Sequence, residues 1–521
     1  MQTHAVSSVC AFGCLTQHVA KGLDQVLARG RWVRFGALAV LGVFAGLGQA
    51  PLDLWPATIA GLALILLVLR SSPTPKQAAF HGWAFGVGYF GFTLRWIVEP
   101  FLVDIARHGW MAPFAIALMA AGAGLFWALT AGFAKRFAPQ SLLMFGLAFV
   151  VAEVTRSLIL SGFPWALLGH SLIPTHLAQL AAFGGPHLLT LIVCLLAVAL
   201  AMFAERPRQK GMSFVLTMFL LGAVTAATWA PPDAPTDTAT GPIVRLVQPN
   251  APQHQKWDPA YRDIYLNRMV ALTGQGDVPD LVVWPETAVP YLLNYISDDL
   301  SLLSDAARGA PLVYGVQRTD AAGQFFNSLV VMGRGGEVQS LYDKRHLVTF
   351  GEYIPGARLL GKAGMTGLAR NLGTGFTPGV ESGPINIPGI GGAIPMICYE
   401  GIFAEEITDG GDRARLLLLI TNDAWFGKAA GPYQHLAQAR LRAIEQGLPM
   451  VRVANTGISA MIDAKGKIVG SLPLGVDGAI DVALPAALPP TLYVRVGDWP
   501  LFGVLLMLTL GHYARRNRNS D

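Results

Sequence analysis

The chain has 521 residues, of which 53% are hydrophobic and 14% are charged, and its mean hydropathy is +0.45. This composition excludes an ordinary soluble two-domain enzyme and predicts an integral membrane protein. Much of the net charge of +5 is explained by lysines and arginines that orient the membrane spans, so it is no evidence for nucleic-acid binding. The four cysteines have no metal-ligand spacing, and only Cys398 lies in the polar half of the chain, so neither a metal site nor a disulfide scaffold is predicted there.

Apolar runs predict eight membrane spans. Residues 1–34 are polar and basic and form a cytoplasmic segment, seven spans follow within residues 35–230, and the eighth occupies residues 498–514. Each run is near the length that a bilayer requires, although the first ones are somewhat short. The seven N-terminal spans cover approximately residues 35–50, 54–70, 79–98, 111–133, 141–160, 187–204 and 213–230. A signal peptide that ends near Gly48-Gln-Ala50 is the alternative to the first span, but a second apolar run starts almost at once after Pro51.

The lysines and arginines between the spans predict their orientation. Basic residues follow the second, fourth, sixth and eighth spans, on the side of the basic N-terminus, and they are Arg70, Lys76, Lys135, Arg136, Arg206, Arg208, Lys210, Arg515, Arg516 and Arg518. The opposite connections hold only Arg107. Because cytoplasmic loops carry the excess of lysine and arginine, both termini, including the tail 515–521, are predicted to be cytoplasmic. Residues 231–490 then lie on the periplasmic side of a bacterial inner membrane, which the chain crosses several times.

Four charged residues, Arg95, Glu99, Glu153 and Arg156, lie in or at the ends of apolar runs. Two interpretations are open: these residues bind a lipid headgroup or each other, or they reach to the membrane interface. The loop Ser161-Gly-Phe-Pro-Trp-Ala166 likewise forms either part of a lipid entrance or an ordinary interfacial loop.

Residues 231–490 alternate strand and helix patterns. Strands are predicted at 243–248, 280–284, 312–316, 328–332, 393–397, 416–421 and 450–454, and helices at 261–272, 298–307 and 434–446. This alternation predicts α/β layers in which helices cover the sheets.

A candidate nucleophile follows one of these strands. The apolar run 393–397 ends at Cys398 within the sequence GIGGAIPMICYEG. A buried strand that stops at a sharp turn presents the thiol at its tip, as nucleophilic catalysis requires. The alternative is that Cys398 is a small buried hydrophobic residue, which is the commoner role of a free cysteine.

Two further ionisable residues follow strand patterns: Glu286 in the sequence WPET and Lys344 in the sequence YDKRHL. A thiol attacks an acyl carbonyl only as a thiolate, so it needs a proton acceptor or a nearby cation. The tetrahedral intermediate also needs fixed donors around its oxyanion. We therefore predict Cys398 as the nucleophile, Glu286 as general base and then general acid, and Lys344 as the cation that stabilises thiolate and oxyanion.

The surroundings of the nucleophile supply further candidates. The backbone N–H of Tyr399 follows the nucleophile at the turn and is a second candidate oxyanion donor. His346 and His435 are alternative partners for a Cys–His pair, although single histidines are more often structural.

Glu, Lys and Cys in this order, with Gly351-Glu-Tyr353 between the lysine and the cysteine, resemble the triad of the nitrilase (carbon–nitrogen hydrolase) superfamily. The resemblance covers approximately residues 242–490 and implies a four-layer αββα sandwich. It also implies that Glu352 orients the triad and that Glu400 supports it.

A domain of this kind between the seventh and eighth of eight spans resembles the apolipoprotein N-acyltransferase family. The matching sequences are QPN at 248–250, KW at 256–257, WPET at 284–287, FGEYIP at 350–355, ICYE at 397–400 and NDAWFG at 422–427. The resemblance implies a ping-pong reaction in which Cys398 takes an acyl chain from a membrane phospholipid as a thioester. The α-amine of the N-terminal diacylglyceryl-cysteine of an apolipoprotein then accepts this chain. Ester and thioester are already activated, so no cofactor is implied.

Two features of the site have alternative interpretations. The glycine-rich apolar segment 356–379 is either a mobile lid or a structural excursion, and Trp257 either helps to exclude water from the thioester or is a core residue. A membrane-tethered amidase or nitrilase is the rival enzyme, and a lipid-binding or transport protein is the non-enzymatic rival. The triad argues against the second rival, and the membrane tether with the apolar segment argues against the first.

Overall fold

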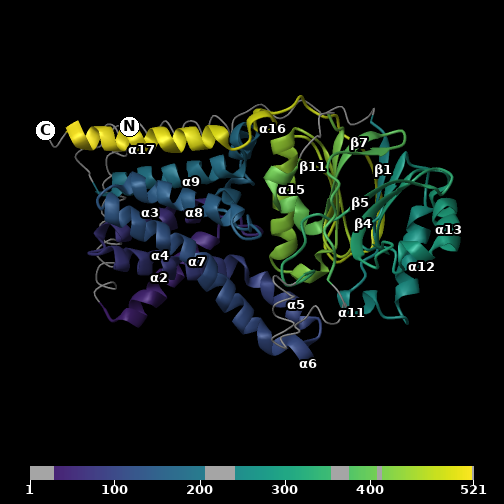
Figure 1. Ribbon diagram of the computed structural model, residues 1–521, viewed down its shortest axis with the longest axis horizontal. Coiled ribbons are helices and arrows are strands. Elements are labelled where there is room, and N and C mark those ends of the chain that lie inside the picture. The colour runs from purple at the N-terminus through teal and green to yellow at the C-terminus, as the bar shows by residue number, and fades with distance from the viewer. Residues whose placement is uncertain (1–28, 206–240, 354–374, 408–412, 519–521) are drawn as a thin grey trace, which may run out of the picture. The chain divides into compact units, whose positions relative to one another are not determined.

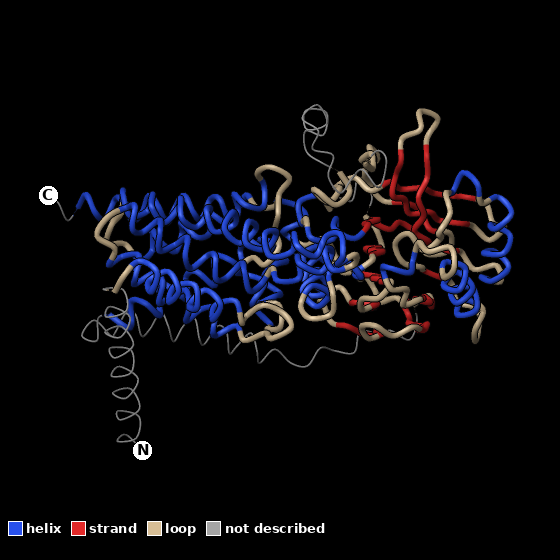
Figure 2. The backbone as a smooth tube through the Cα atoms, turned by 90° about the horizontal axis from the view of Figure 1, so that it is seen from below, coloured by secondary structure: helices blue, strands red, loops and turns tan. Residues whose placement is uncertain are grey.

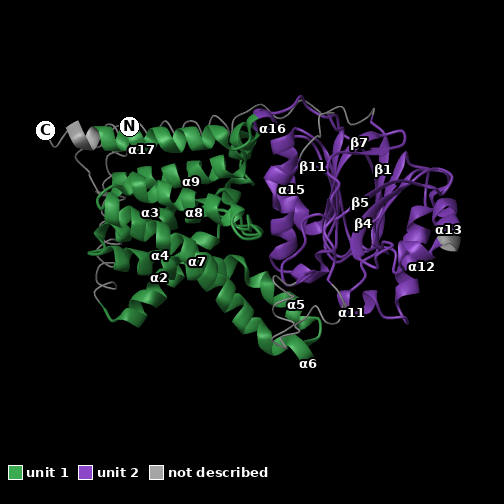
Figure 3. Cartoon of the chain, viewed as in Figure 1, with its two compact units in different colours: residues 1–232, 496–521 green, residues 233–495 purple. Residues whose placement is uncertain are grey.

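The computed structural model describes residues 29–205, 241–353, 375–407 and 413–518. The chain forms two compact units (Figure 3). Unit 1 comprises residues 1–232 and 496–521, and unit 2 comprises residues 233–495. This division follows the change from the apolar to the more polar part of the sequence.

Unit 1 is helical in its described part (Figure 2). Prolines occupy the first turns of several of its helices, where their missing N–H is not needed. The longer helices are α2 (Arg31–Gly46), α3 (Trp55–Ser71), α4 (Pro75–Thr93), α7 (Ala112–Phe137), α8 (Leu142–Leu158), α9 (Ala181–Glu205) and α17 (Trp499–Arg518). The shorter ones are η1 (Arg95–Val98), α5 (Glu99–Leu102), α6 (Ile105–His108), η2 (Gly109–Met111), η3 (Leu168–Leu172) and η4 (His176–Leu180).

Glycines allow three of these helices to approach one another closely. A Cβ added at Gly88 of α4 would lie 1.9 Å from the carbonyl oxygen of Ala39 in α2. A Cβ added at Gly86 of α4 would lie 2.8 Å from Cα of Gly124 in α7. Such contacts through small residues are typical of helices that pack within a membrane.

Seven of the eight predicted spans coincide with described helices, and the remaining one, 213–230, lies outside the described residues. By length and composition, two described helical segments, Ile105–Phe137 and His176–Ala204, are long and apolar enough to cross a membrane. Trp55–Ser71 and Trp499–Ala514 are shorter apolar helices. Unit 1 is thus consistent with membrane insertion, and the number of eight spans stays a prediction.

Glu153 and Arg156 of α8 form a buried ion pair. Nη2 of Arg156 lies 2.8 Å from Oε2 of Glu153, and the indole N–H of Trp127 donates to Oε1 of Glu153 over 2.7 Å. Arg156 also donates to the carbonyl oxygens of Phe163 and Trp165 in the following loop. Both side chains are at most 3% exposed, so the interface-reaching interpretation is wrong for this pair. The two residues bind each other and hold the loop.

Unit 2 contains two six-stranded sheets, with strand orders β12-β1-β2-β3-β4-β5 and β11-β10-β9-β8-β7-β6. β1, β2 and β3 are parallel neighbours in the first sheet, and β7, β8 and β9 are parallel neighbours in the second. The strands are β1 (Ile243–Gln248), β2 (Leu281–Val283), β3 (Leu312–Thr319), β4 (Phe325–Met332), β5 (Val338–Asp343), β6 (Ile385–Ile387), β7 (Gly391–Ile397), β8 (Leu416–Thr421), β9 (Met450–Ala454), β10 (Ser459–Ile462), β11 (Ile468–Leu472) and β12 (Gly478–Ala483).

Helices connect and cover these strands. They are α11 (Gln253–Lys256), α12 (Arg262–Thr273), η6 (Leu293–Tyr295), α13 (Ser297–Ala307), η8 (Cys398–Ile402), η9 (Ala404–Glu406), η10 (Asp423–Phe426) and α15 (Gly431–Gln446), with α16 (Leu492–Val496) at the boundary between the units in the sequence. Because the carboxyl ends of parallel strands meet at one edge of a sheet, residues that follow neighbouring parallel strands are brought together there.

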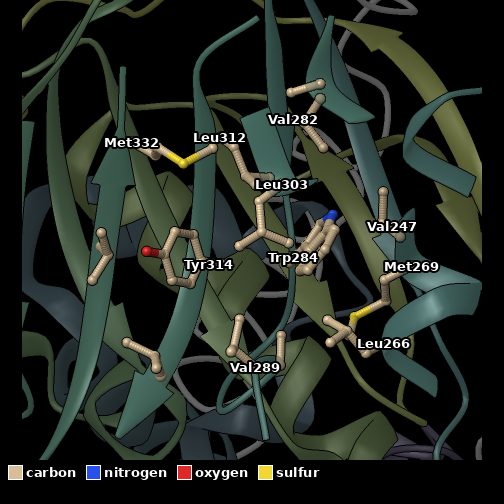
Figure 4. Packing of buried hydrophobic residues seen from close by; sticks show 14 of the residues in the cluster. Val247, Leu266, Met269, Val282, Trp284, Val289, Leu303, Leu312, Tyr314 and Met332 are labelled. Carbon is tan, nitrogen blue, oxygen red and sulfur yellow. The ribbon is translucent and has the colours of Figure 1, made fainter. Parts of the chain in front are cut away.

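Each sheet has an apolar core against its helices. Figure 4 shows Leu266 and Met269 of α12 and Leu303 of α13 around Trp284, next to the first sheet. In the second sheet, strands β7 to β10 pack on α15, for example through Ala439. Between the sheets, the hydroxyl group of Ser459 in β10 donates to the side chain of Gln248 in β1 over 2.7 Å. The layers therefore follow the order helix, sheet, sheet, helix (Figure 1), as the resemblance implies.

Every strand and helix predicted for this part of the chain is present, with shifted ends. The strand pattern before Lys344, which was predicted without bounds, corresponds to β5, and four strands, β6, β10, β11 and β12, were not predicted. β6 has only three residues, and β11 and β12 are mostly half-buried, so they lack the continuous apolar run that marks a central strand.

Candidate active site

Cys398 lies at a strained turn directly after β7. Its φ angle is +53°, a left-handed conformation that residues other than glycine rarely adopt. The turn is closed by the backbone N–H of Ile397, which donates to Oε2 of Glu400 over 2.7 Å. The side chain of Cys398 is 5% exposed. This arrangement turns the chain sharply at the end of the strand, as the sequence predicts for a nucleophile.

Glu286 follows β2 and has a carboxylate that is fixed at both oxygens. Nδ2 of Asn327 donates to Oε1 and the backbone N–H of Asn422 donates to Oε2, each over 2.8 Å. Nζ of Lys344 lies 3.7 Å from Oε1. Glu286 is buried, so these donors replace the water that a carboxylate would otherwise bind.

Lys344 follows β5, and its ammonium group lies between two carboxylates. Nζ donates to Oε1 of Glu352 over 2.8 Å, in addition to its contact with Glu286. Oε2 of Glu352 accepts a hydrogen bond from the backbone N–H of Val348 over 2.8 Å. Glu352 therefore gives the lysine a second carboxylate contact beside Glu286, which is a physical basis for an orienting role.

The charges around the thiol set its resting state. Burial raises the pKa of Cys398, and Glu286 raises it further, against the opposing effects of Lys344 and of a hydrogen bond with Thr421. Burial opposes the charge of Lys344, but Glu352, Glu286 and Cys398 together raise its pKa above the ordinary value. At neutral pH the thiol is therefore protonated and the lysine charged, so attack requires a base to remove the thiol proton.

Glu400 connects the turn of Cys398 to the residues that follow Lys344, here called the lysine loop (residues 345–348). Its Oε1 accepts hydrogen bonds from the hydroxyl group of Tyr342 over 2.8 Å and from the backbone N–H groups of Arg345 over 2.7 Å and His346 over 3.2 Å. Its Oε2 accepts the Ile397 N–H described above. Burial raises the pKa of Glu400, and these donors oppose that shift. One side chain thus joins the turn of Cys398 to the residues that follow Lys344.

The two candidate histidines contact groups around the turn of Cys398. Nδ1 of His346 lies 2.6 Å from Oε1 of Glu406, and its ring stacks on Phe403. Nε2 of His435 lies 3.2 Å from the carbonyl oxygen of Cys398. These contacts engage both rings with groups other than the thiol, and the Cys–His alternative stays a prediction. Among the residues that the structure describes, no group of three or more His, Cys, Asp or Glu side chains could hold a metal ion.

Tyr399 and Trp257 differ in their surroundings. Tyr399 is 7% exposed and packs edge-on against His346 and Phe403. Trp257 is 42% exposed, so the core interpretation of this residue is wrong. Its ring lies beneath Nζ of Lys256, at 5.8 Å from the ring centroid.

The proposed lid lies mostly outside the described residues, which include only 375–379 of the segment 356–379. Within this part, the backbone N–H of Phe376 donates to the carbonyl oxygen of Glu352 over 3.0 Å. The N–H of Gly379 donates to the carbonyl oxygen of Lys344 over 2.8 Å. A Cβ at Gly379 would lie 2.2 Å from the carbonyl oxygen of Asp343, so only glycine fits here. The segment therefore ends against two residues of the site.

Three residues near Glu286 were not singled out from the sequence. Asn327 and Asn422 are the donors to Glu286, and Lys256 donates from Nζ to the carbonyl oxygen of Glu286 over 2.9 Å and to Oγ1 of Thr287 over 2.7 Å. Burial lowers the pKa of Lys256 to about 8, although Glu286 and Cys398 oppose the shift. Lys256 and Asn422 lie within the KW and NDAWFG sequences. These two motifs therefore supported the family resemblance, but they did not indicate what either residue does.

Fold and site together define the class of a carbon–nitrogen hydrolase, and a family model described as carbon-nitrogen hydrolase matches residues 243–488. A second model, described as the apolipoprotein N-acyltransferase N-terminal domain, matches residues 41–199. The chain is 36% identical to an apolipoprotein N-acyltransferase of Rhodopseudomonas palustris, over 94% of this chain and 97% of the relative. It is 34% identical to one of Brucella melitensis, over the same shares of the two chains. The chain belongs to the apolipoprotein N-acyltransferase family.

A solved carbon–nitrogen hydrolase of Helicobacter pylori is also similar in part. It is 17% identical, with a TM-score of 0.36, and the match covers 48% of this chain and 90% of that one. The family assignment rests on the family models and on the relatives that match along nearly the whole chain.

Proposed function

We propose that the chain transfers an acyl group from a membrane phospholipid, through a thioester on Cys398, to the α-amine of an apolipoprotein's N-terminal diacylglyceryl-cysteine. One observation carries the proposal: Glu286, Lys344 and Cys398 follow separate strands, Lys344 contacts Glu286, and the buried Glu400 joins the turn of Cys398 to the residue after Lys344. The names of the relatives support the choice of acyl acceptor.

In the first step, Glu286 accepts the thiol proton and the sulfur of Cys398 attacks the ester carbonyl of the phospholipid. Lys344 and the backbone N–H of Tyr399 stabilise the oxyanion. When the intermediate collapses, the carbon–oxygen bond of the ester breaks and Glu286 returns the proton to the leaving glycerol oxygen. The products are a thioester on Cys398 and a lysophospholipid, and the site has regained its original charge.

In the second step, the α-amine attacks the thioester carbonyl. Glu286 accepts a proton from the amine, the same donors stabilise the second oxyanion, and the carbon–sulfur bond breaks. The proton passes to the departing sulfur, which restores the Cys398 thiol and leaves an amide on the acceptor. Because the acyl group stays on Cys398 after the lysophospholipid has left, the two substrates can react one after the other by a ping-pong mechanism.

The supporting residues keep this geometry through both steps. The bond from Lys344 to Glu352 prevents the ammonium group from pairing with Glu286 alone, so a cation stays available to the oxyanion. Trp257, which is partly exposed, is proposed to cover the thioester and exclude water. The same proposal places unit 2 on the periplasmic side of an eight-span inner-membrane protein, on the basis of the lysine and arginine distribution.

Intact-protein mass spectrometry after incubation with phospholipid vesicles tests the first step. We expect one added acyl chain on the wild-type protein, and none on Cys398→Ala or Glu286→Gln. The Glu286→Gln protein keeps the shape of the side chain and removes the base, so acylation at the wild-type rate would refute the role of Glu286.

Decay of the purified acyl-enzyme distinguishes a transferase from a hydrolase. The donor lipid is removed, and the thioester is followed with and without a diacylglyceryl-cysteinyl peptide. We expect slow decay alone and fast decay with the peptide, together with an amide-linked acyl chain on the peptide. Equal decay in both samples, with free fatty acid as the product, would establish the amidase-like hydrolase instead.

A further inference from the structure

A buried chain of polar side chains ends at the backbone of the nucleophile. Nη2 of Arg452 donates to Oδ2 of Asp423 over 2.6 Å, and Oδ1 of Asp423 lies 2.9 Å from Nδ1 of His435. Nε2 of His435 then lies 3.2 Å from the carbonyl oxygen of Cys398. The side chains of Arg452, Asp423 and His435 are all 0% exposed. None of them has a role in the steps described above, although burying such a group of charges is costly.

The chemistry of the last contact fixes its direction. A carbonyl oxygen only accepts hydrogen bonds, so Nε2 of His435 carries the hydrogen and donates to Cys398. The ring cannot easily rotate, because Nδ1 is held at the carboxylate of Asp423 and Phe426 packs edge-on against the ring. Burial would raise the pKa of Asp423, but Arg452 and His435 hold it well below its usual value, so the group that fixes the ring is a carboxylate.

The planarity of the peptide bond carries this constraint to the other side of the turn. In a trans peptide the C=O and the following N–H point in opposite directions within one plane. The carbonyl group of Cys398 and the N–H of Tyr399 belong to the same peptide. A donor that holds the carbonyl oxygen therefore also sets the direction of the Tyr399 N–H. It polarises the peptide as well, which makes this N–H a stronger donor.

We propose that His435 is a positioning residue that aims the backbone N–H of Tyr399 at the oxyanion by holding the carbonyl oxygen of Cys398. Asp423 and Arg452 keep the ring of His435 in place. This inference rests on the proposed acyl transfer, in which the Tyr399 N–H is an oxyanion donor. Its test concerns the acylation step alone and does not depend on the identity of the natural acyl donor.

Two substitutions of His435 separate its two contacts. The amide nitrogen of glutamine reaches the position of Nε2, so His435→Gln keeps a donor for the carbonyl oxygen of Cys398 and loses the nitrogen that faces Asp423 and Arg452. The amide nitrogen of asparagine reaches the position of Nδ1, so His435→Asn keeps the contact with Asp423 and loses the donor to Cys398. His435→Leu is a second variant without a donor to the carbonyl oxygen of Cys398, and its side chain is of similar size. The melting temperature of each protein establishes that it is folded.

Two reactions of Cys398 are measured on each full-length, detergent-solubilised variant in which the cysteines other than Cys398 are replaced by alanine. Acylation by p-nitrophenyl butyrate passes through an oxyanion, whereas alkylation by iodoacetamide does not. Loss of one oxyanion donor costs roughly 10²–10³-fold in rate, so a misdirected donor should slow acylation of His435→Asn and His435→Leu about 10- to 100-fold. Alkylation should change little, and His435→Gln should retain most of the acylation rate.

Equal losses of acylation in the asparagine and glutamine variants would overturn the proposal, because they would indicate a general structural role. A parallel loss of acylation and alkylation would overturn it too, since the thiol itself would then be displaced. A chain that reacts with the p-nitrophenyl ester as expected but takes no acyl group from phospholipid would refute the proposed function and leave this inference intact.

Discussion

Glu400→Gln tests whether one carboxylate couples the nucleophile to the lysine loop. Oε1 of Glu400 faces three donors, from Tyr342, Arg345 and His346, and Oε2 faces the N–H of Ile397. Glutamine has a single acceptor oxygen, so its amide group must turn an N–H towards one of these two sets. Keeping the three donors satisfied places the new N–H against that of Ile397, directly before the nucleophile.

The expected cost follows from these contacts. A hydrogen bond to a charged group contributes roughly 1.5–3 kcal/mol, and a buried donor left without an acceptor costs about 1–3 kcal/mol. The substitution should therefore lower the free energy of unfolding by about 2–4 kcal/mol. Because the lost bond closes the turn of Cys398, and because a displacement of about 1 Å can cost 10²-fold in rate, acyl-enzyme formation should fall about 10- to 100-fold.

The assay combines thermal unfolding of the detergent-solubilised protein with intact mass measurement of acyl-enzyme formation over time. Glu337→Gln is the matched control, because Glu337 is an acid on the connection between β4 and β5 whose side chain accepts a hydrogen bond from Gln339 rather than from the donors to Glu400. It should change neither quantity. If Glu400→Gln formed the acyl-enzyme at the wild-type rate with an unchanged unfolding midpoint, the coupling role of Glu400 would be refuted.

Three further predictions concern the thiol, the buried polar cluster and the topology. Because burial raises the pKa of Cys398, alkylation by iodoacetamide should keep rising from pH 7 to about 10, without the plateau near pH 9 that an ordinary thiol would show, and such a plateau would contradict the shift. Gly457→Ala would place a Cβ 2.3 Å from Oδ2 of Asp423, so it should destabilise the protein by about 1–3 kcal/mol. Gly274→Ala, whose nearest contact would be 3.7 Å, should not, and equal melting temperatures of the two variants would count against the clash. Reporters fused after Asp521 or within residues 206–210 should read cytoplasmic and one inserted at Pro235 periplasmic; an external C-terminus would refute the eight-span arrangement.

Local pattern alone indicated the chemistry of the candidate site. Glu286 and Cys398 each follow an apolar strand, which is recognisable within a few residues because its side chains are buried on both faces. The run 416–421, for example, is buried along its whole length, as its leucines predict. Lys344 follows β5, whose side chains are mostly exposed or half-buried. The alternation of strands and helices indicated α/β layers with helices over the sheets, whereas the order of the four layers came from the resemblance to the nitrilase superfamily.

Tertiary structure decided which groups surround these residues. The N–H that holds Oε2 of Glu286 comes from Asn422, 136 positions along the chain, and no local pattern predicts that pairing. The role of His435 depends on which nitrogen faces the turn of Cys398, and the packing of α15 against the second sheet sets this orientation. The sequence left two interpretations open for Glu153 and Arg156. The folded structure shows that they pair with each other and that Trp127 of the neighbouring helix α7 donates to Glu153. Side-chain partners of this kind are decided by the register and packing of distant segments, because a hydrogen bond depends on positions within a few tenths of an ångström, whereas burial requires only the right kind of residue.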